Sequence, residues 1–177
     1  MQKQIKILLT ILMALALAVS CAKNNPNNPT EDPNIPPDNE WVNNPNFTKL
    51  QKTWQDKDYN TSKYVITDNK FDSLYNDSVS YSFDIKYINW SSDTAGIIYG
   101  QYTANSYSQE VVGKWYAVSF NGLTDSQVSI GGASKNIGTT ENPIYDFSAE
   151  NLKEAISKFT EANGYFGVYS DCTAVTK

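Results

Sequence analysis

The sequence of 177 residues contains no histidine and no arginine. Without histidine the chain cannot build a Ser-His-Asp or Cys-His catalytic arrangement, nor a metal site with imidazole ligands. Without arginine it lacks the side chain that most often reads bases bidentately, and its 14 lysines are outnumbered by 19 acidic residues. We therefore exclude nucleic acid as a partner. A carboxylate-dependent hydrolase is the one enzymatic alternative that this composition leaves open.

Cysteine is also scarce, because the chain has only Cys21 and Cys172. Cys172 alternates with Phe166, Val168 and Ser170, on the more apolar side of the run YFGVYSDC. A free cysteine in such a pattern commonly behaves as a small buried hydrophobe. We expect Cys172 to be buried, with an intermolecular disulfide or a reactive thiol as the alternative.

The amino terminus carries the one long hydrophobic run. Lys3 and Lys6 precede an uncharged apolar stretch, residues 7–19, which ends in small residues and Cys21. A helix of this length would be about 20 Å long, well short of the roughly 30 Å hydrocarbon core of a bilayer. The pattern predicts a cleaved secretory signal over residues 1–20 and not a permanent span.

Residues 18–21, Ala-Val-Ser-Cys, resemble the lipobox of bacterial lipoproteins in its relaxed form, with Ala three places before the cysteine. The resemblance implies that Cys21 receives diacylglycerol and a further fatty acid such as palmitate, and that the chain is cut just before it. Two or three acyl chains make membrane attachment effectively irreversible. The resemblance thus implies an exported protein, anchored to the outer membrane or cell surface through Cys21. An ordinary signal peptide with an incidental cysteine is the alternative.

A tether and one domain are expected after Cys21. Residues 22–40 hold five of the seven prolines and almost nothing apolar, which predicts a disordered spacer over residues 21–40. Removal of residues 1–20 takes away two lysines and no acids, so the mature chain has a formal charge of −7. Residues 41–177 have the usual size of a single domain.

Alternation of aromatic and β-branched residues with polar ones predicts a mainly β domain. Strands are expected at residues 50–55, 63–67, 70–75, 79–90, 95–103, 114–121, 126–130 and 164–172. A helix is expected over residues 149–162, capped by Ser148, with Leu152, Ala155, Ile156 and Phe159 on its apolar face. We predict a small antiparallel barrel of about eight strands, lipocalin-like, with this helix before the last strand. A β-sandwich with a docked helix is the alternative.

Four segments, GIIYGQYT, VGKWYAVSFNGLT, LKEAISKFT and GYFGVYSDC, together resemble the carboxy-terminal domain of a family of spirochaete lipoproteins, especially treponemal ones, of unassigned function. The resemblance covers roughly residues 48–172, and its motifs are structural. Trp54 is also similar to the tryptophan of the first lipocalin strand, although Lys52 stands where lipocalins have glycine. The helix before the last strand departs from the lipocalin plan, so ligand transport does not follow from this likeness.

No segment predicts a catalytic, cofactor or metal site. Asp56, Asp58 and Asn60 have the spacing of a calcium loop, but Thr61 and Thr67 replace its glycine and final glutamate, which favours a solvated Asx turn. The glycines of residues 131–140 lack the spacing of a nucleotide-binding loop.

Alternating residues are instead expected to share the inward face of the barrel, either as packed core or as the lining of a ligand cavity. They are Trp54, Tyr81, Phe83, Ile85, Tyr87, Val118 and Phe120, with the pairs Val128 and Ile130, and Phe166 and Val168. We expect a non-enzymatic module that binds a small apolar or sugar-like ligand, or a host or envelope partner. A purely structural or antigenic surface component is the alternative.

Overall fold

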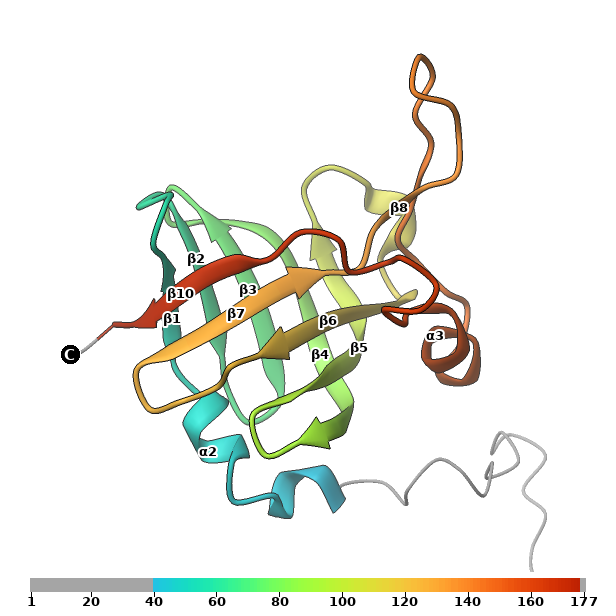
Figure 1. Ribbon diagram of the computed structural model, residues 1–177. Coiled ribbons are helices and arrows are strands. Elements are labelled where there is room, and N and C mark those ends of the chain that lie inside the picture. The colour runs from blue at the N-terminus through green and yellow to red at the C-terminus, as the bar shows by residue number, and fades with distance from the viewer. Residues whose placement is uncertain (1–39, 176–177) are drawn as a thin grey trace, which may run out of the picture. The chain divides into compact units, whose positions relative to one another are not determined.

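The computed structural model describes residues 40–175, which form a closed antiparallel β-barrel (Figure 1). Within these residues eight strands complete the barrel in the order β1-β10-β7-β6-β5-β4-β3-β2. Their bounds are β1 Thr53–Asp56, β2 Ser62–Ile66, β3 Lys70–Tyr75, β4 Ser78–Ser92, β5 Ala95–Asn105, β6 Trp115–Asn121, β7 Gln127–Gly132 and β10 Ser170–Ala174. The predicted barrel is confirmed, and the sandwich alternative does not apply.

Closure of the barrel depends on β10, which pairs with both the first strand and the seventh. Trp54 of β1 lies opposite Ala174, and Val128 of β7 lies opposite Cys172. The other neighbours in the wall are consecutive in the chain and joined as antiparallel hairpins. The β3–β4 hairpin turns at Asn76-Asp77, where both residues have positive φ, 49° and 61°. This conformation suits the right-handed twist of the strands and is tolerated best by Gly, Asn and Asp.

The two ends of the barrel differ because two short helices precede β1 and lie at one end only. The 3-10 helix η1 (Glu40–Asn43) and the short helix α2 (Phe47–Leu50) precede β1, and Trp54 Nε1 donates a 2.9 Å hydrogen bond to the Leu50 carbonyl. Since consecutive strands are antiparallel, β1, β3 and β5 all run away from the α2 end. The loops that follow them, residues 57–61, 76–77 and 106–114, therefore lie together at the opposite end, which we call the outer end.

The connection from β7 to β10 also crosses the outer end. It contains the two-stranded ribbon of β8 (Lys135–Asn136) and β9 (Tyr145–Asp146), whose tip projects from the barrel in Figure 1, and then helix α3 (Leu152–Lys158). The β5–β6 loop carries a second 3-10 helix, η2 (Gln109–Val111). Among residues 40–175 we find no helix with the length and apolar character needed to cross a membrane.

The helix is shorter than the sequence pattern predicts. Its cap is Asn151, whose side chain accepts a 2.9 Å hydrogen bond from the Glu154 N–H, and not Ser148. Ala149 cannot join the helix because it pairs with Trp115 in an isolated β-bridge. At the other end, the side chain of Asn163 donates to the carbonyls of Ser157 and Lys158, both at 2.9 Å, and so satisfies the last turn. Backbone pairing and this side-chain cap set both ends of α3.

The last strand also differs from its prediction, since residues 164–169 lie outside β10. Ser170 is the first residue with a ladder partner on β7, Ile130. Val168, predicted to lie in the core beside Phe166, is 83% exposed, whereas Phe166 is buried. The backbone at Val168 passes close to Gly131, where an added Cβ would lie 2.9 Å from the Val168 carbonyl oxygen. Val168 lies outside the β-ladder, so no strand pairing turns its side chain toward the core.

Candidate functional site

Aromatic rings pack against one another inside the barrel. Phe71 and Phe83 stack with centroids 4.9 Å apart, and Tyr102 stacks on Tyr116 at 4.6 Å. Tyr116 also meets the edges of Phe83 at 5.8 Å and Tyr81 at 5.4 Å, which joins the two stacks. Ring centroids 4.5–7 Å apart are in direct contact. This part of the interior is therefore filled by the protein's own side chains.

Six of the seven residues predicted to be core or ligand-lining belong to this interior. Trp54, Phe83, Val118 and Phe120 are at most 1% exposed, and Ile85 is 5% exposed. Tyr81 is partly buried and packs against the same core. Their contacts are those of a packed core. Cys21, the predicted lipidation site, lies outside the described residues.

Tyr87 is the exception, because it lies on the outer face of the barrel. The register of β4 against β5 shifts between Ile85 and Tyr87, so Ile85 lies opposite Gly100 and Tyr87 lies opposite Tyr99. Tyr99 in turn donates its hydroxyl to the carbonyl of Phe159, the residue after α3. A β-bulge of this kind changes which residues of a strand face inward. Tyr87 is buried, at 9% exposed, and belongs to the hydrophobic core as predicted, but the prediction that it shares the face of Ile85 is wrong.

Buried tyrosine hydroxyls form the polar part of the interior. Burial raises the pKa values of Tyr81, Tyr102 and Tyr116 above the ordinary 10.0. The hydroxyl of Tyr64 lies 3.1 Å from Ser170 Oγ. These phenols therefore stay protonated at physiological pH.

The calcium-loop candidate forms the predicted Asx turn, although Asp56 is 5% exposed and so is buried, not solvated. Asp56 Oδ1 accepts hydrogen bonds from the backbone N–H groups of Asp58 at 2.9 Å and Tyr59 at 3.1 Å. In residues 40–175 no group of three or more His, Cys, Asp or Glu side chains is placed to hold a metal ion. Cys172 is a buried free thiol, and burial raises its pKa to about 12.

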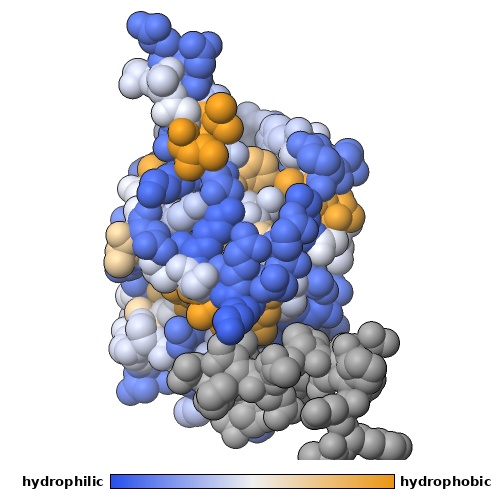
Figure 2. Space-filling view, turned by 90° about the vertical axis from the view of Figure 1, so that its right-hand side faces the viewer, coloured by the Kyte–Doolittle hydropathy of each residue, from blue (hydrophilic) through white to orange (hydrophobic). Residues whose placement is uncertain are grey.

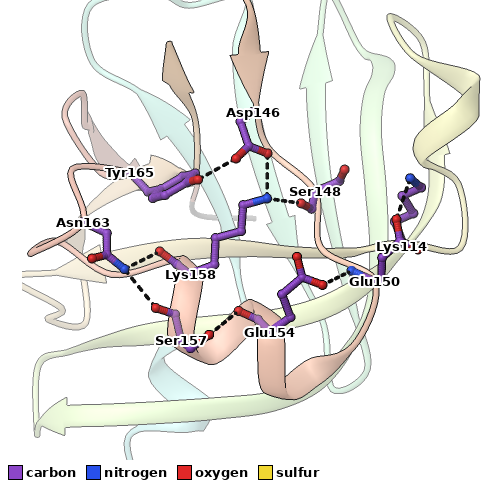
Figure 3. A network of polar contacts seen from close by, with 9 residues as sticks. All are labelled: Lys114, Asp146, Ser148, Glu150, Glu154, Ser157, Lys158, Asn163 and Tyr165. Carbon is purple, nitrogen blue, oxygen red and sulfur yellow. Dashed lines mark hydrogen bonds and ion pairs between the residues drawn. The ribbon is translucent and has the colours of Figure 1, made fainter. Parts of the chain in front are cut away.

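A second polar cluster joins the base of the ribbon to α3 (Figure 3). Asp146 accepts hydrogen bonds from Lys158 Nζ at 2.7 Å and from the Tyr165 hydroxyl at 2.6 Å, and Lys158 also donates to the Ser148 carbonyl at 2.7 Å. We call Asp146, Lys158 and Tyr165 the clasp. Burial and the Asp146 carboxylate raise the pKa of Tyr165 to about 12. Since each of the three side chains is hydrogen-bonded to another member, the clasp has a structural role: it holds the ribbon against α3.

Large side chains are exposed mainly on loops and on the ribbon. Figure 2 shows apolar surface below the projecting segment at the top of its view, the stretch in which Ile137, Ile144 and Tyr145 are each 60% exposed. At the outer end Tyr59, Tyr75 and Tyr107 are 67%, 54% and 80% exposed. We call these three tyrosines the tyrosine rim.

The tyrosine rim is absent from the sequence-based candidates, because those were chosen by alternation along strands. The residues next to the rim tyrosines in the sequence do indicate their exposure. Tyr59 and Tyr107 are each flanked by turn-forming residues, in Asp58-Tyr59-Asn60 and Ser106-Tyr107-Ser108, and Tyr75 directly precedes the turn at Asn76-Asp77. An aromatic residue within a turn cluster has no inward face to occupy.

Comparison of the chain with protein-family models, with curated proteins and with solved structures finds no match.

Proposed function

We propose that this chain is an exported, lipid-anchored envelope protein whose barrel is a rigid scaffold for binding, without enzymatic activity. The lipobox at residues 18–21 supports the anchor. The observation that carries the binding role is the contrast between the two sets of aromatic rings. Those inside the barrel stack on one another, whereas the tyrosine rim is exposed at the outer end.

This contrast favours binding at the surface over binding of a small ligand inside the barrel. A small-molecule site is normally a concave cavity with a few convergent polar groups. Phe71, Phe83 and Tyr116 instead fill part of the inside of the barrel with ring-to-ring contacts. Loops held by a rigid β scaffold are a common place for binding residues.

The anchor is tested by metabolic labelling with palmitate. Wild-type protein should incorporate the label and migrate as the processed form, whereas Cys21→Ser should remain unlabelled and unprocessed. Cys172→Ser is the matched control, because it removes the other thiol and should be labelled like the wild type. Normal labelling and cleavage of Cys21→Ser would refute the lipoprotein assignment. Protease treatment of intact cells then separates a surface location from a periplasmic one.

Native mass spectrometry of the purified chain tests the site of binding. We expect the mass of the protein and its lipid alone. A stoichiometric apolar compound that is lost in Phe83→Ala would instead place the ligand inside the barrel and remove the argument for the outer end.

A further inference from the structure

The segments that carry the tyrosine rim, two loops and the end of β3, are neighbours around the outer end. The backbone N–H of Asn76 donates a 2.9 Å hydrogen bond to the Thr61 carbonyl, which joins the β3–β4 turn to the β1–β2 loop. In the same way, the Ser106 N–H donates at 2.8 Å to the Ser80 carbonyl and joins the β5–β6 loop to β4. Val79, 45% exposed, lies on the strand between them. The three segments that carry the rim are therefore linked to one another at the outer end.

Buried side chains hold two of the three tyrosines in place. Asp56 and Asn105 are each 5% exposed, and they are two of the five buried polar residues among those described. Asp56 accepts a hydrogen bond from the Tyr59 N–H, and Asn105 accepts from the N–H groups of Tyr107 and Ser108, both at 3.0 Å. A buried hydrogen-bonded anchor under an exposed ring reduces the conformational entropy that the loop loses on binding.

The area of the rim indicates a ligand smaller than a protein. A tyrosine side chain buries on the order of 200 Å² when fully covered, so the exposed fractions of these three amount to about 400 Å². Each partner in a standard protein–protein interface contributes about 800 Å². The rim alone supplies about half of that area.

The charges around the rim indicate an uncharged ligand. Lys63 is paired with Asp77 at 2.6 Å, and Lys114 is paired with Glu150 at 2.8 Å. Exposed Lys57 stands next to exposed Asp58 in the sequence, so the positive charges of the outer end are matched by negative ones. The sequence as a whole is acidic, which disfavours polyanions. The remaining polar groups near the rings include the amides of Asn60 and Asn76 and the hydroxyl of Thr61, which can both donate and accept hydrogen bonds.

We infer that the tyrosine rim binds an uncharged glycan chain. Tyrosine rings offer apolar faces to the C–H faces of sugar rings, while their hydroxyls and the nearby amides hydrogen-bond to sugar hydroxyls. The rim lies at the end of the barrel opposite α2. The inference rests on the proposed binding role of the outer end and is independent of the anchor.

The test is binding of the full mature chain, purified in detergent, to an array of neutral hexose and N-acetylhexosamine glycans together with sulfated and uronic-acid glycans. We expect binding to neutral members of the array that is insensitive to salt. Changing Tyr59, Tyr75 and Tyr107 together to Ser should weaken it at least tenfold, and each single change several-fold. Tyr145→Ser, which removes an equally exposed tyrosine from the ribbon, should bind like the wild type. Unchanged thermal unfolding establishes that the variants are folded.

Three results would overturn the inference: no binding to any neutral glycan, equal binding by the triple variant, or salt-sensitive binding confined to anionic glycans. Binding of the rim to a purified envelope protein in place of glycans would also overturn it, while preserving the proposed function. Failure of Cys21 acylation would refute the anchor and leave the glycan result unaffected.

Discussion

The wall of the barrel from β1 to β7 and the connection from Ala133 to Tyr169 are organised by different interactions. In the wall, backbone ladders fix the register of each strand, so that partners such as Phe71 and Phe83 lie opposite one another. In the connection the ladders are two residues long or absent. There the side-chain hydrogen bonds of the clasp hold the backbone in place. Alternation consequently identifies inward residues in the wall and fails in the connection.

The difference shows what a periodic pattern means physically. A period of two predicts burial only where hydrogen bonds hold the chain extended and a sheet lies beneath it. Val168 and Phe166 have the same spacing as a pair of wall residues, yet one is exposed and the other is buried. Substitutions made separately in the wall and in the connection test this difference between the two regions.

The largest effect is expected in the wall, from Phe83→Ala. Phe83 is 0% exposed and contacts Phe71 and Tyr116. Truncation should reduce the free energy of unfolding by about 3 to 5 kcal/mol, from lost burial and the cavity that remains. Urea unfolding of the full chain measures the change. A loss below about 1 kcal/mol would mean that the ring is not packed in the core.

A smaller and more local effect is expected in the connection, from Lys158→Met. The substitution keeps the aliphatic stem and removes the charged donor to Asp146, whose ion pair is 2.7 Å long and about one-fifth exposed. We expect a loss of about 1.5 to 3 kcal/mol, the range for hydrogen bonds to charged groups. Amide exchange should accelerate at residues 144–165 and stay unchanged in β4. Equal acceleration in both regions would contradict the separation of wall and connection.

The clasp also predicts a dependence on acid pH. Although burial alone would raise the pKa of Asp146, its hydrogen bonds from Lys158 and Tyr165 dominate and lower it below 3.8. A carboxylate with a depressed folded-state pKa stabilises the protein above its unfolded pKa, and that stabilisation is lost as pH falls through the folded value. Wild-type stability should therefore fall below about pH 4 more steeply than that of Asp146→Asn. Parallel curves between pH 2 and 5 would show that the clasp contributes nothing.

Val168→Ser should change stability by less than about 0.5 kcal/mol, the usual range for exposed positions. Val168 is 83% exposed despite its position in an alternating run. Val128→Ser is the matched control in the wall, where the same substitution at a 2% exposed site should be clearly destabilising. Similar losses for the two variants would restore the view that residues 164–172 form one strand.

The smallest effect is expected for chemical modification of Cys172, which lies in the barrel strand β10. Because burial raises the pKa of its thiol to about 12, the reactive thiolate is scarce at pH 8. Iodoacetamide should leave native protein unmodified and should label Cys172 after unfolding in urea. Rapid labelling of the native state would favour the reactive-thiol alternative.

Much of the wall is readable from the sequence, because each strand carries its own alternation. The strand predicted at residues 70–75 coincides with β3, and the one predicted at 79–90 lies within β4. The register shift beside Lys86 is not readable, since it depends on how β4 meets β5, and it moves Tyr87 to the outer face. The candidate site was predicted on the strands because only strands carry an alternating pattern, whereas the tyrosine rim combines two loop residues, Tyr59 and Tyr107, with Tyr75 at the end of β3.

The sequence by itself determines the fold class, the position of most strands, the Asx turn at Asp56 and the exclusion of histidine chemistry, because each follows from composition or from neighbours a few residues apart. Tertiary structure alone decides the closure of β10 between β1 and β7, the ends of α3, the exposure of Val168 and the grouping of the rim tyrosines. These features depend on contacts between residues far apart in the chain, such as Trp54 with Ala174, and no local pattern specifies which distant partner a segment will meet.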